Sequence, residues 1–246
     1  MSLEPYKRYR EAVLEKLQKA FRQEKEIAIA SKWIASAIVN QGWIYTSGTG
    51  HSHMLAEEIF YRAGGFARVI PILDPDLMLH KDASGSTEVE RREGYARTLF
   101  QPYSITSQDV FIISSNSGRN SVSVEMAQIA QEKGAKVIVI TNYAHSKSVD
   151  SRHSSGLKLF QVSDLFLDTF GEIGDASINL DGLSTNVGAT STVVGAALLN
   201  AIMVQSAALA LEYGIVPEIF NSSNSDEGET HNETLISKYK AEVKIL

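Results

Sequence analysis

The chain has 246 residues, of which 43% are hydrophobic and 21% charged, with a formal net charge of −6. This composition is typical of a globular protein with a sizeable core, and the acidic balance without a basic cluster argues against a nucleic-acid partner. The absence of cysteine excludes disulfides, a thiolate nucleophile and a cysteine zinc site, and it fits a cytoplasmic location. No apolar run reaches the roughly 18–20 residues of a membrane span, and the charged N-terminal segment lacks an apolar signal core, so we expect no membrane partner.

The first forty residues predict a long amphipathic helical arm. Leu14 and Leu17 lie on one face of this helix, and Ile34 continues the apolar stripe further along. Because such a stripe needs a covering surface, we expect the arm, residues 1–40, to pack either on the main domain, residues 41–246, or on a partner subunit.

Beyond the arm, short apolar runs alternate with helical patterns, and each run ends in small polar residues as buried parallel strands do. The alternation predicts an α/β fold, a three-layer sandwich in which a five-stranded parallel sheet has helices on both faces. We expect the flavodoxin-like strand order 2-1-3-4-5, which makes the first and third strands neighbours at the crevice where such sheets bind ligands. The predicted strands span residues 43–46, 67–73, 110–114, 136–141 and 164–169, and a long apolar helix rich in small residues spans 186–213.

Polar segments connect or follow these elements. Residues 74–94 are predicted to form one long loop, and loops of this length are usually functional lids or disordered. The charged side chains in this segment, which include His80, Glu88 and Glu90, are expected to be mostly solvated. Further predicted loops are residues 171–185 and the first half of the C-terminal tail, which ends in a short helix near residues 235–243.

Two strand-to-helix turns are rich in glycine and serine. The first, GTGHS, spans residues 48–52, and the second, SNSGRN, spans residues 115–120. Hydroxyl and amide side chains beside the unpaired N–H groups at the start of a helix suit an anion, most often a phosphate. Neither turn has the third glycine of a dinucleotide fingerprint or the Lys-Ser/Thr of a nucleoside-triphosphate loop, which disfavours a nucleotide-binding flavodoxin-like protein. We therefore expect both turns to hold one phosphate-type ligand, and we expect no cofactor.

These turns resemble those of the sugar isomerase (SIS) domain family. GTGHS matches the first SIS turn, SNSGRN is similar to the second, which is usually S-x-S-G-x-T, and the resemblance covers roughly residues 35–213. It implies that the ligand is a phosphorylated sugar, with Ser52 donating from the first turn and an amide, Asn120, standing where the family often has threonine. The binding residues that follow from the two turns are Gly50, His51, Ser52, Ser115, Asn116, Ser117 and Asn120.

The segment Ala56-Glu57-Glu58 resembles the phosphoheptose isomerases in particular, which carry Ala-Glu-Glu on the same helix four residues further along. This resemblance implies an aldose–ketose isomerase that moves a proton between adjacent carbons through an enediol, with Glu58 as the first choice for the base and Glu57 next. Those enzymes also have a metal-ligating histidine on the long C-terminal helix. Here that helix contains no histidine, so no metal ligand is predicted, and His231 in the tail is the candidate to replace it.

Two other functions remain open at this point. One is a non-catalytic module that senses a phosphosugar, and the other is a SIS-type etherase or lyase that acts on an amino-sugar phosphate. In each case we expect a homo-oligomer, a dimer or a tetramer, because the helical arm and the apolar helix at residues 186–213 both need covering.

Overall fold

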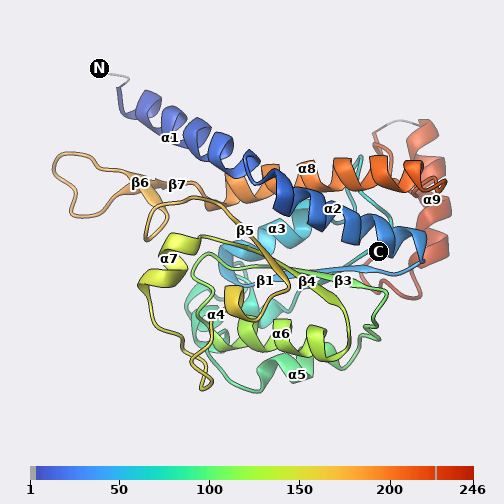
Figure 1. The fold of residues 1–246 in the computed structure, drawn as a ribbon, viewed down its shortest axis with the longest axis horizontal. Coiled ribbons are helices and arrows are strands. Elements are labelled where there is room, and N and C mark those ends of the chain that lie inside the picture. The colour runs from blue at the N-terminus through green and yellow to red at the C-terminus, as the bar shows by residue number, and fades with distance from the viewer. Residues whose placement is uncertain (1–3, 225) are drawn as a thin grey trace.

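The computed structural model describes residues 4–224 and 226–246. Its centre is a five-stranded parallel sheet in the order β2-β1-β3-β4-β5, with helical layers on both sides (Figure 1). The predicted α/β class and strand order are therefore confirmed. The strands are β1 (Ile44–Gly48), β2 (Val69–Ile72), β3 (Val110–Ser114), β4 (Lys136–Thr141) and β5 (Leu165–Asp168).

The helices divide between the two faces of the sheet (Figure 1). One face is covered by α2 (Glu24–Val39), α3 (His53–Glu58) and α8 (Ser191–Glu212), and α1 (Glu4–Phe21) runs along α8. The other face is covered by α4 (Ala83–Val89), α5 (Tyr95–Phe100), α6 (Ser121–Glu132) and α9 (Asp226–Tyr239). A short helix, α7 (Tyr143–Ser148), follows β4, and single 3-10 turns occur at Gly50–Ser52, Pro75–Leu77 and Leu159–Gln161.

Side-chain alternation along the strands explains the two cores. In β3, Ile112 faces the layer that contains α2 and α8, whereas Phe111 and Ile113 face α5 and α6. Every residue of β3 is buried, as expected for a central strand with a helical layer on each face.

The N-terminal arm forms two helices, and the prediction of one continuous helix was wrong. The break falls at Gln23, between the end of α1 and the start of α2. The Gln23 side chain accepts a hydrogen bond from Asp168 N–H (2.8 Å) and donates one to the Asp168 carbonyl (2.9 Å). It thereby pairs with the open edge of β5, which otherwise has unpaired backbone groups. Ile34 on α2 is fully buried in the core, whereas Leu14 on α1 stays exposed.

Residues 74–94 are also more ordered than the predicted single loop. The Asp74 carboxylate accepts a hydrogen bond from Asp76 N–H (2.9 Å) at the start of a 3-10 turn, and Asp82 accepts one from Gly85 N–H (3.0 Å) at the start of α4. The polar residues that suggested a loop are thus helix caps. This segment brings α4 to the sheet end where the two glycine-rich turns lie.

A two-stranded antiparallel hairpin, β6 (Ala176–Ile178) and β7 (Val187–Ala189), lies within residues predicted as loop and helix. It projects away from the body of the molecule beside the N-terminal end of α1 (Figure 1). The long helix α8 consequently starts at Ser191 rather than near residue 186. At the other end of the chain, α9 starts at Asp226, earlier than the helix predicted near residues 235–243.

Helix α8 contradicts the expectation that no segment has the length and apolarity of a membrane span. By length and composition alone, α8 is long and apolar enough to cross a membrane. In the fold, however, α8 lies along α2 and buries Leu198, Leu199 and Ile202 in the core. Packing against the sheet layer therefore accounts for the buried side of this helix, as for the core helix of a globular domain.

Gly48, where β1 meets the first glycine-rich turn, provides a test of this architecture. A Cβ at this position would lie 2.4 Å from the Ser52 carbonyl oxygen, a backbone atom that cannot rotate away. We expect Gly48→Ala to lower the free energy of unfolding by about 3 kcal/mol in urea denaturation, because the turn must shift. Gly64→Ala is the control, because a Cβ added there would have no atom within 4 Å. Its φ of +82° would cost the alanine a backbone strain of only about 1 kcal/mol. Equal losses for the two variants would contradict the tight turn.

Candidate functional site

Both glycine-rich turns open onto one cavity at the carboxyl ends of β1 and β3. Its volume is about 420 Å³. All seven residues that the sequence predicted for ligand binding line this cavity. The structure thus brings together two turns that lie more than sixty positions apart in the chain. The role of these residues in binding phosphate remains a prediction. They are Gly50, His51 and Ser52 from the first turn and Ser115, Asn116, Ser117 and Asn120 from the second.

The first turn is a 3-10 turn, Gly50–Ser52, that leads directly into α3. Gly50 has a φ of +56°, a left-handed conformation that glycine adopts without a steric penalty. The Ser52 N–H donates to the Thr49 carbonyl (3.0 Å), which closes the turn. The hydroxyl of Thr49 points to α4 instead of the ligand side and donates to Glu90 Oε2 (2.6 Å).

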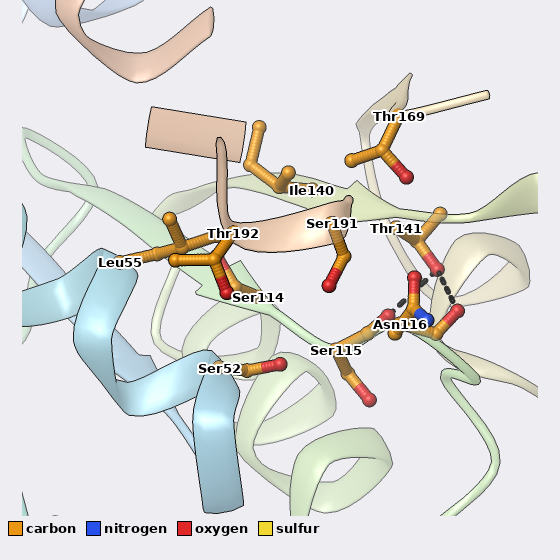
Figure 2. Close-up of a pocket in the computed structure, with 10 residues that line it drawn as sticks. All are labelled: Ser52, Leu55, Ser114, Ser115, Asn116, Ile140, Thr141, Thr169, Ser191 and Thr192. Carbon is orange, nitrogen blue, oxygen red and sulfur yellow. Dashed lines mark hydrogen bonds between the residues drawn. The ribbon is translucent and has the colours of Figure 1, made fainter. Parts of the chain in front are cut away.

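The second turn is fixed by β4 and by its own side chain. Thr141 Oγ1 donates to the carbonyls of Ser115 (2.7 Å) and Asn116 (3.2 Å), as the dashed lines in Figure 2 show. The Ser115 hydroxyl accepts from Gly118 N–H (3.2 Å), and Gly118 has a φ of +58°. The turn is therefore held in one shape before any ligand arrives.

This shape leaves hydrogen-bonding groups of the second turn without partners. Among the residues that the structure describes, none accepts a hydrogen bond from the backbone N–H of Ser117, Arg119 or Asn120, just before α6. The Asn116 Oδ1 atom is likewise buried with no donor in the described part of the chain. Unsatisfied donors at the start of a helix are suited to an anion.

A small recess joins the two turns to the start of α8. It has a volume of about 20 Å³, enough for roughly one water molecule. Figure 2 shows Ser52, Ser115 and Ser191 around this space, each from a different element. Three serine hydroxyls thus surround the deepest part of the site.

The segment from Phe170 to Asp175 follows β5, and its last two residues, Gly174 and Asp175, line the cavity. Phe170 and Asp175 both have left-handed backbones, with φ of 52° and 70°. This conformation costs a non-glycine residue roughly 1–3 kcal/mol. Two long-range contacts hold the segment: Lys16 Nζ lies 3.0 Å from Glu172 Oε1, and Asn142 Nδ2 donates to the Glu172 carbonyl (2.9 Å). The strain therefore persists because α1 and β4 fix the chain around it.

Asp175 itself is used to cap α8. Its Oδ1 accepts hydrogen bonds from the N–H groups of Thr190 (3.1 Å) and Ser191 (2.9 Å), and its Oδ2 accepts from the Ser191 hydroxyl (2.5 Å). Both carboxylate oxygens are therefore occupied, and the N-terminus of α8 already has its negative partner.

Helix α4 and its C-terminal cap supply two cavity residues, Thr87, which the sequence analysis did not name, and Glu90, which it named only among the charges of the polar segment 74–94. They are three positions apart, so they share one face of the helix. Glu90 was expected to be solvated because it lay in a supposed loop. The signal that could have revealed it is the cap, Asp82 followed by small residues, which starts a helix at Ala83.

His145, another cavity residue that was not predicted, sits on α7. The Gly174 N–H donates to its Nδ1 atom (2.9 Å), so the proton of the neutral ring is on Nε2. Burial lowers the pKa of His145 below the usual value, the charge of Asp175 partly opposes this, and Arg119 adds to it. The ring is therefore a neutral hydrogen-bond donor near neutral pH.

Positive charge gathers beside the second turn although the whole chain is acidic. Arg152 Nη1 donates to the Asn120 side-chain carbonyl (2.8 Å). Burial lowers the pKa of Arg152, the charges of Arg119 and Arg91 lower it further, and Glu90 acts in the opposite direction. The Arg152 guanidinium beside Asn120, together with Arg119 of the turn itself, favours an anionic ligand at this end of the cavity.

The three catalytic candidates from the sequence, Glu57, Glu58 and His231, do not line this cavity within one chain. The Glu58 carboxylate pairs with Arg62 and accepts from Asn200 Nδ2 on α8 (2.7 Å). Glu57 is half exposed, and His231 Nε2 hydrogen-bonds the carbonyl of Ile219 (2.9 Å), a residue that pairs with Phe66 just before β2. Glu57 and Glu58 lie outside the cavity because α3 leads away from the first turn, so its last residues face α8 and solvent. Their catalytic role remains a prediction.

In the described ranges, 4–224 and 226–246, no group of three or more His, Asp or Glu side chains is placed to hold a metal ion. Polar groups of this cavity are instead hydroxyls, amides, two imidazoles and two carboxylates. Such a set can bind an anion at one end and a polyhydroxylated molecule along its length.

The fold and this pair of serine-rich turns are those of a SIS domain. The sequence model of the SIS domain family matches residues 6–142, from the helical arm to the end of β4. A UPF0309 protein of Halalkalibacterium halodurans is 40% identical over 238 residues, 97% of this chain and 98% of the relative. A UPF0309 protein of Geobacillus thermodenitrificans is 41% identical over 239 residues, 97% of this chain and 96% of the relative. The chain therefore belongs to the SIS domain family and, within it, to the UPF0309 family.

Solved structures of similar fold include phosphoheptose isomerases. That of Francisella tularensis has a TM-score of 0.57 and 14% sequence identity, covering 84% of this chain and 98% of that chain. That of Neisseria gonorrhoeae has a TM-score of 0.50 and 14% identity, covering 82% of this chain and 96% of that chain. At this level of identity the likeness concerns the fold alone.

The lowered pKa of His145 predicts how stability depends on pH. Because the folded pKa lies below the unfolded value, the unfolded chain binds the proton more readily, so stability is full above about pH 6.5 and is lost as the pH falls below it. We expect His145→Gln to reduce the loss of unfolding free energy between about pH 7.5 and about pH 5.5. The control is Ala144→Gln, which adds the same side chain at an exposed position of α7. If His145→Gln keeps the full wild-type slope, the imidazole is not the group that titrates.

Proposed function

We propose that this protein binds a phosphorylated sugar in the cavity, with the phosphate between the two turns. The observation that carries the proposal is the convergence of Ser52, Ser115 and Ser117 on one cavity. Because the two turns share one cavity, their hydroxyls and free backbone N–H groups can all donate to the same phosphate dianion. Each hydrogen bond to a charged group contributes about 1.5–3 kcal/mol.

The size and charge of the site support a small anionic ligand. A volume of about 420 Å³ lies in the range of small-molecule pockets. The guanidinium of Arg152, which hydrogen-bonds Asn120, attracts a phosphate. The polar wall beyond it, with Thr87, Glu90 and His145, offers partners for sugar hydroxyls.

We further propose that the reaction is the interconversion of an aldose phosphate and a ketose phosphate through an enediol. Such a reaction needs a base near adjacent carbons and a donor for the carbonyl oxygen. The phosphoheptose isomerases of similar fold support this reaction class, and the cavity contains groups of both kinds.

A sensing module without chemistry is the second candidate. The observation that favours it is that the carboxylates nominated by the sequence, Glu57 and Glu58, lie outside the cavity of the single chain. A protein that binds phosphosugars but never turns one over would fit this alternative.

Ligand binding can be measured by thermal shift against phosphorylated aldoses, ketoses and amino sugars. A ligand at about 100 times its dissociation constant should add about 2.7 kcal/mol of stability, and the same sugars without phosphate should add little. We expect Ser52→Ala and Ser117→Ala each to weaken binding about tenfold, because each removes a donor to the phosphate. Ser184→Ala, exposed on the hairpin loop, is the matched control. Unchanged affinity in both turn variants would overturn the proposed phosphate position.

We also propose that the protein is a homo-oligomer, because apolar side chains remain uncovered on α1 and α8. Val204 is 72% exposed, and Leu211 and Leu14 are both more than half exposed. Val204 and Leu211 are seven positions apart and therefore share one face of α8, and apolar side chains gathered on an exposed face usually belong to an interface.

Multi-angle light scattering at micromolar concentration should therefore give at least a dimer. We expect Val204→Glu to shift the protein toward the monomer, because a carboxylate would be buried without a partner. Ala144→Glu adds the same charge on α7 as a control. A wild-type monomer would contradict the proposal.

A further inference from the structure

Glu90 connects the two turns of the cavity. Its Oε2 accepts a hydrogen bond from the Thr49 hydroxyl of the first turn (2.6 Å). Its backbone carbonyl accepts one from Val122 N–H (3.1 Å), in the first turn of α6, which follows the second glycine-rich turn. One residue at the end of α4 is thus fixed to both halves of the site, by its side chain to one and by its main chain to the other.

The other carboxylate oxygen of Glu90, Oε1, has no hydrogen-bond donor among the described residues. Nor does any side chain in the described part of the chain form an ion pair with this carboxylate within 4.0 Å. The residue lines the cavity and is only partly buried, so this oxygen can reach a molecule bound there.

The other acidic groups near the site are already engaged or directed elsewhere. Both oxygens of Asp175 accept hydrogen bonds at the start of α8. Glu58 pairs with Arg62 and Asn200, and Glu57 is beside His53, both outside the cavity. Elimination and geometry thus point to the same carboxylate.

We propose that Glu90 is the catalytic base of the reaction and that Thr49 is its positioning residue. This inference rests on the proposed function, a phosphosugar bound between the turns. It replaces the glutamates of α3 with a carboxylate from the segment that the sequence predicted to be a polar loop.

The proton transfer balances without any external oxidant or reductant. The Glu90 carboxylate removes the proton from C2 of the aldose, and the electron pair of that C–H bond forms the C1=C2 bond while the carbonyl oxygen on C1 takes a proton. Glu90 then returns its proton to C1, the new C1–H bond forms, and the hydroxyl on C2 loses its proton to become the ketone. His145, with its proton on Nε2, lines the same cavity and is placed to lend and recover the proton of the oxygens.

The test measures exchange for deuterium of the proton that the base removes, which is on C2 of an aldose phosphate and on C1 of a ketose phosphate, by NMR in heavy water, together with binding. The probes are ribose 5-phosphate, glucose 6-phosphate, glucosamine 6-phosphate and sedoheptulose 7-phosphate, with net isomerisation followed in the same spectra. Glu90→Gln keeps the shape of the side chain, and we expect it to lose at least about 100-fold in exchange rate while it still binds the phosphosugar. Glu88→Gln, an exposed change on α4 outside the cavity lining, is the matched control, with expected exchange within about threefold of wild type, and Glu58→Gln is measured beside it as the rival candidate for the base.

The possible results separate this inference from the proposed function. If Glu90→Gln exchanges at the wild-type rate, or if Glu58→Gln loses exchange instead, the assignment of the base is wrong. If the wild-type protein binds a probe but exchanges none of the probes, the assignment is also wrong although phosphosugar binding stands. If the wild-type protein binds no phosphosugar, the proposed function fails with it.

Thr49 gives a second, independent measurement. Thr49→Val removes the hydroxyl and should lower kcat about tenfold with little change in KM, because the base loses its orientation but the phosphate site stays intact. Thr49→Ser keeps the hydroxyl and should restore kcat. A merely structural role would predict similar losses for both variants, or a change in KM and thermal stability in place of kcat.

Discussion

The parallel register between β1 and β3 places the two glycine-rich turns side by side, and the rest of the site depends on this placement. Gly48 pairs with Ser114, so the residues that follow the two strands leave the sheet side by side. Both strands run in the same direction, and each is followed by a turn with hydroxyl side chains and a helix. A phosphate at this edge can therefore meet donors from two turns at once, which neither turn offers alone.

The rest of the cavity is assembled around this pair of turns at a measurable cost in backbone strain. Glu90, at the end of α4, links the two turns, while Asp175, at the end of a segment with left-handed residues at Phe170 and Asp175, forms part of the wall. Lys16 on α1 and Asn142 after β4 hold that wall. The site thus combines one end formed by the two fixed turns, where we propose that the phosphate binds, with a more varied polar end that would hold the sugar.

Sequence reasoning succeeded where local chemistry determines the structure. Apolar runs that stop at serine and glycine predicted the strands, their order and the turns that share a cavity. It failed for α4, because the aspartates that cap it are equally common in loops. It also had no signal for Asp175, a non-glycine residue with a φ of 70° that tertiary contacts impose. Glu57 and Glu58 were chosen by resemblance, and only the direction of α3 shows that they leave the cavity.

The central claim, that two turns hold one anion, can be tested most directly by amide NMR of isotopically labelled protein titrated with inorganic phosphate and then with fructose 6-phosphate. The account predicts that the backbone amides of Ser52, Ser117 and Asn120 shift together with one dissociation constant, and that fructose without phosphate leaves them unchanged. Shifts confined to one turn, or different dissociation constants for the two turns, would contradict it.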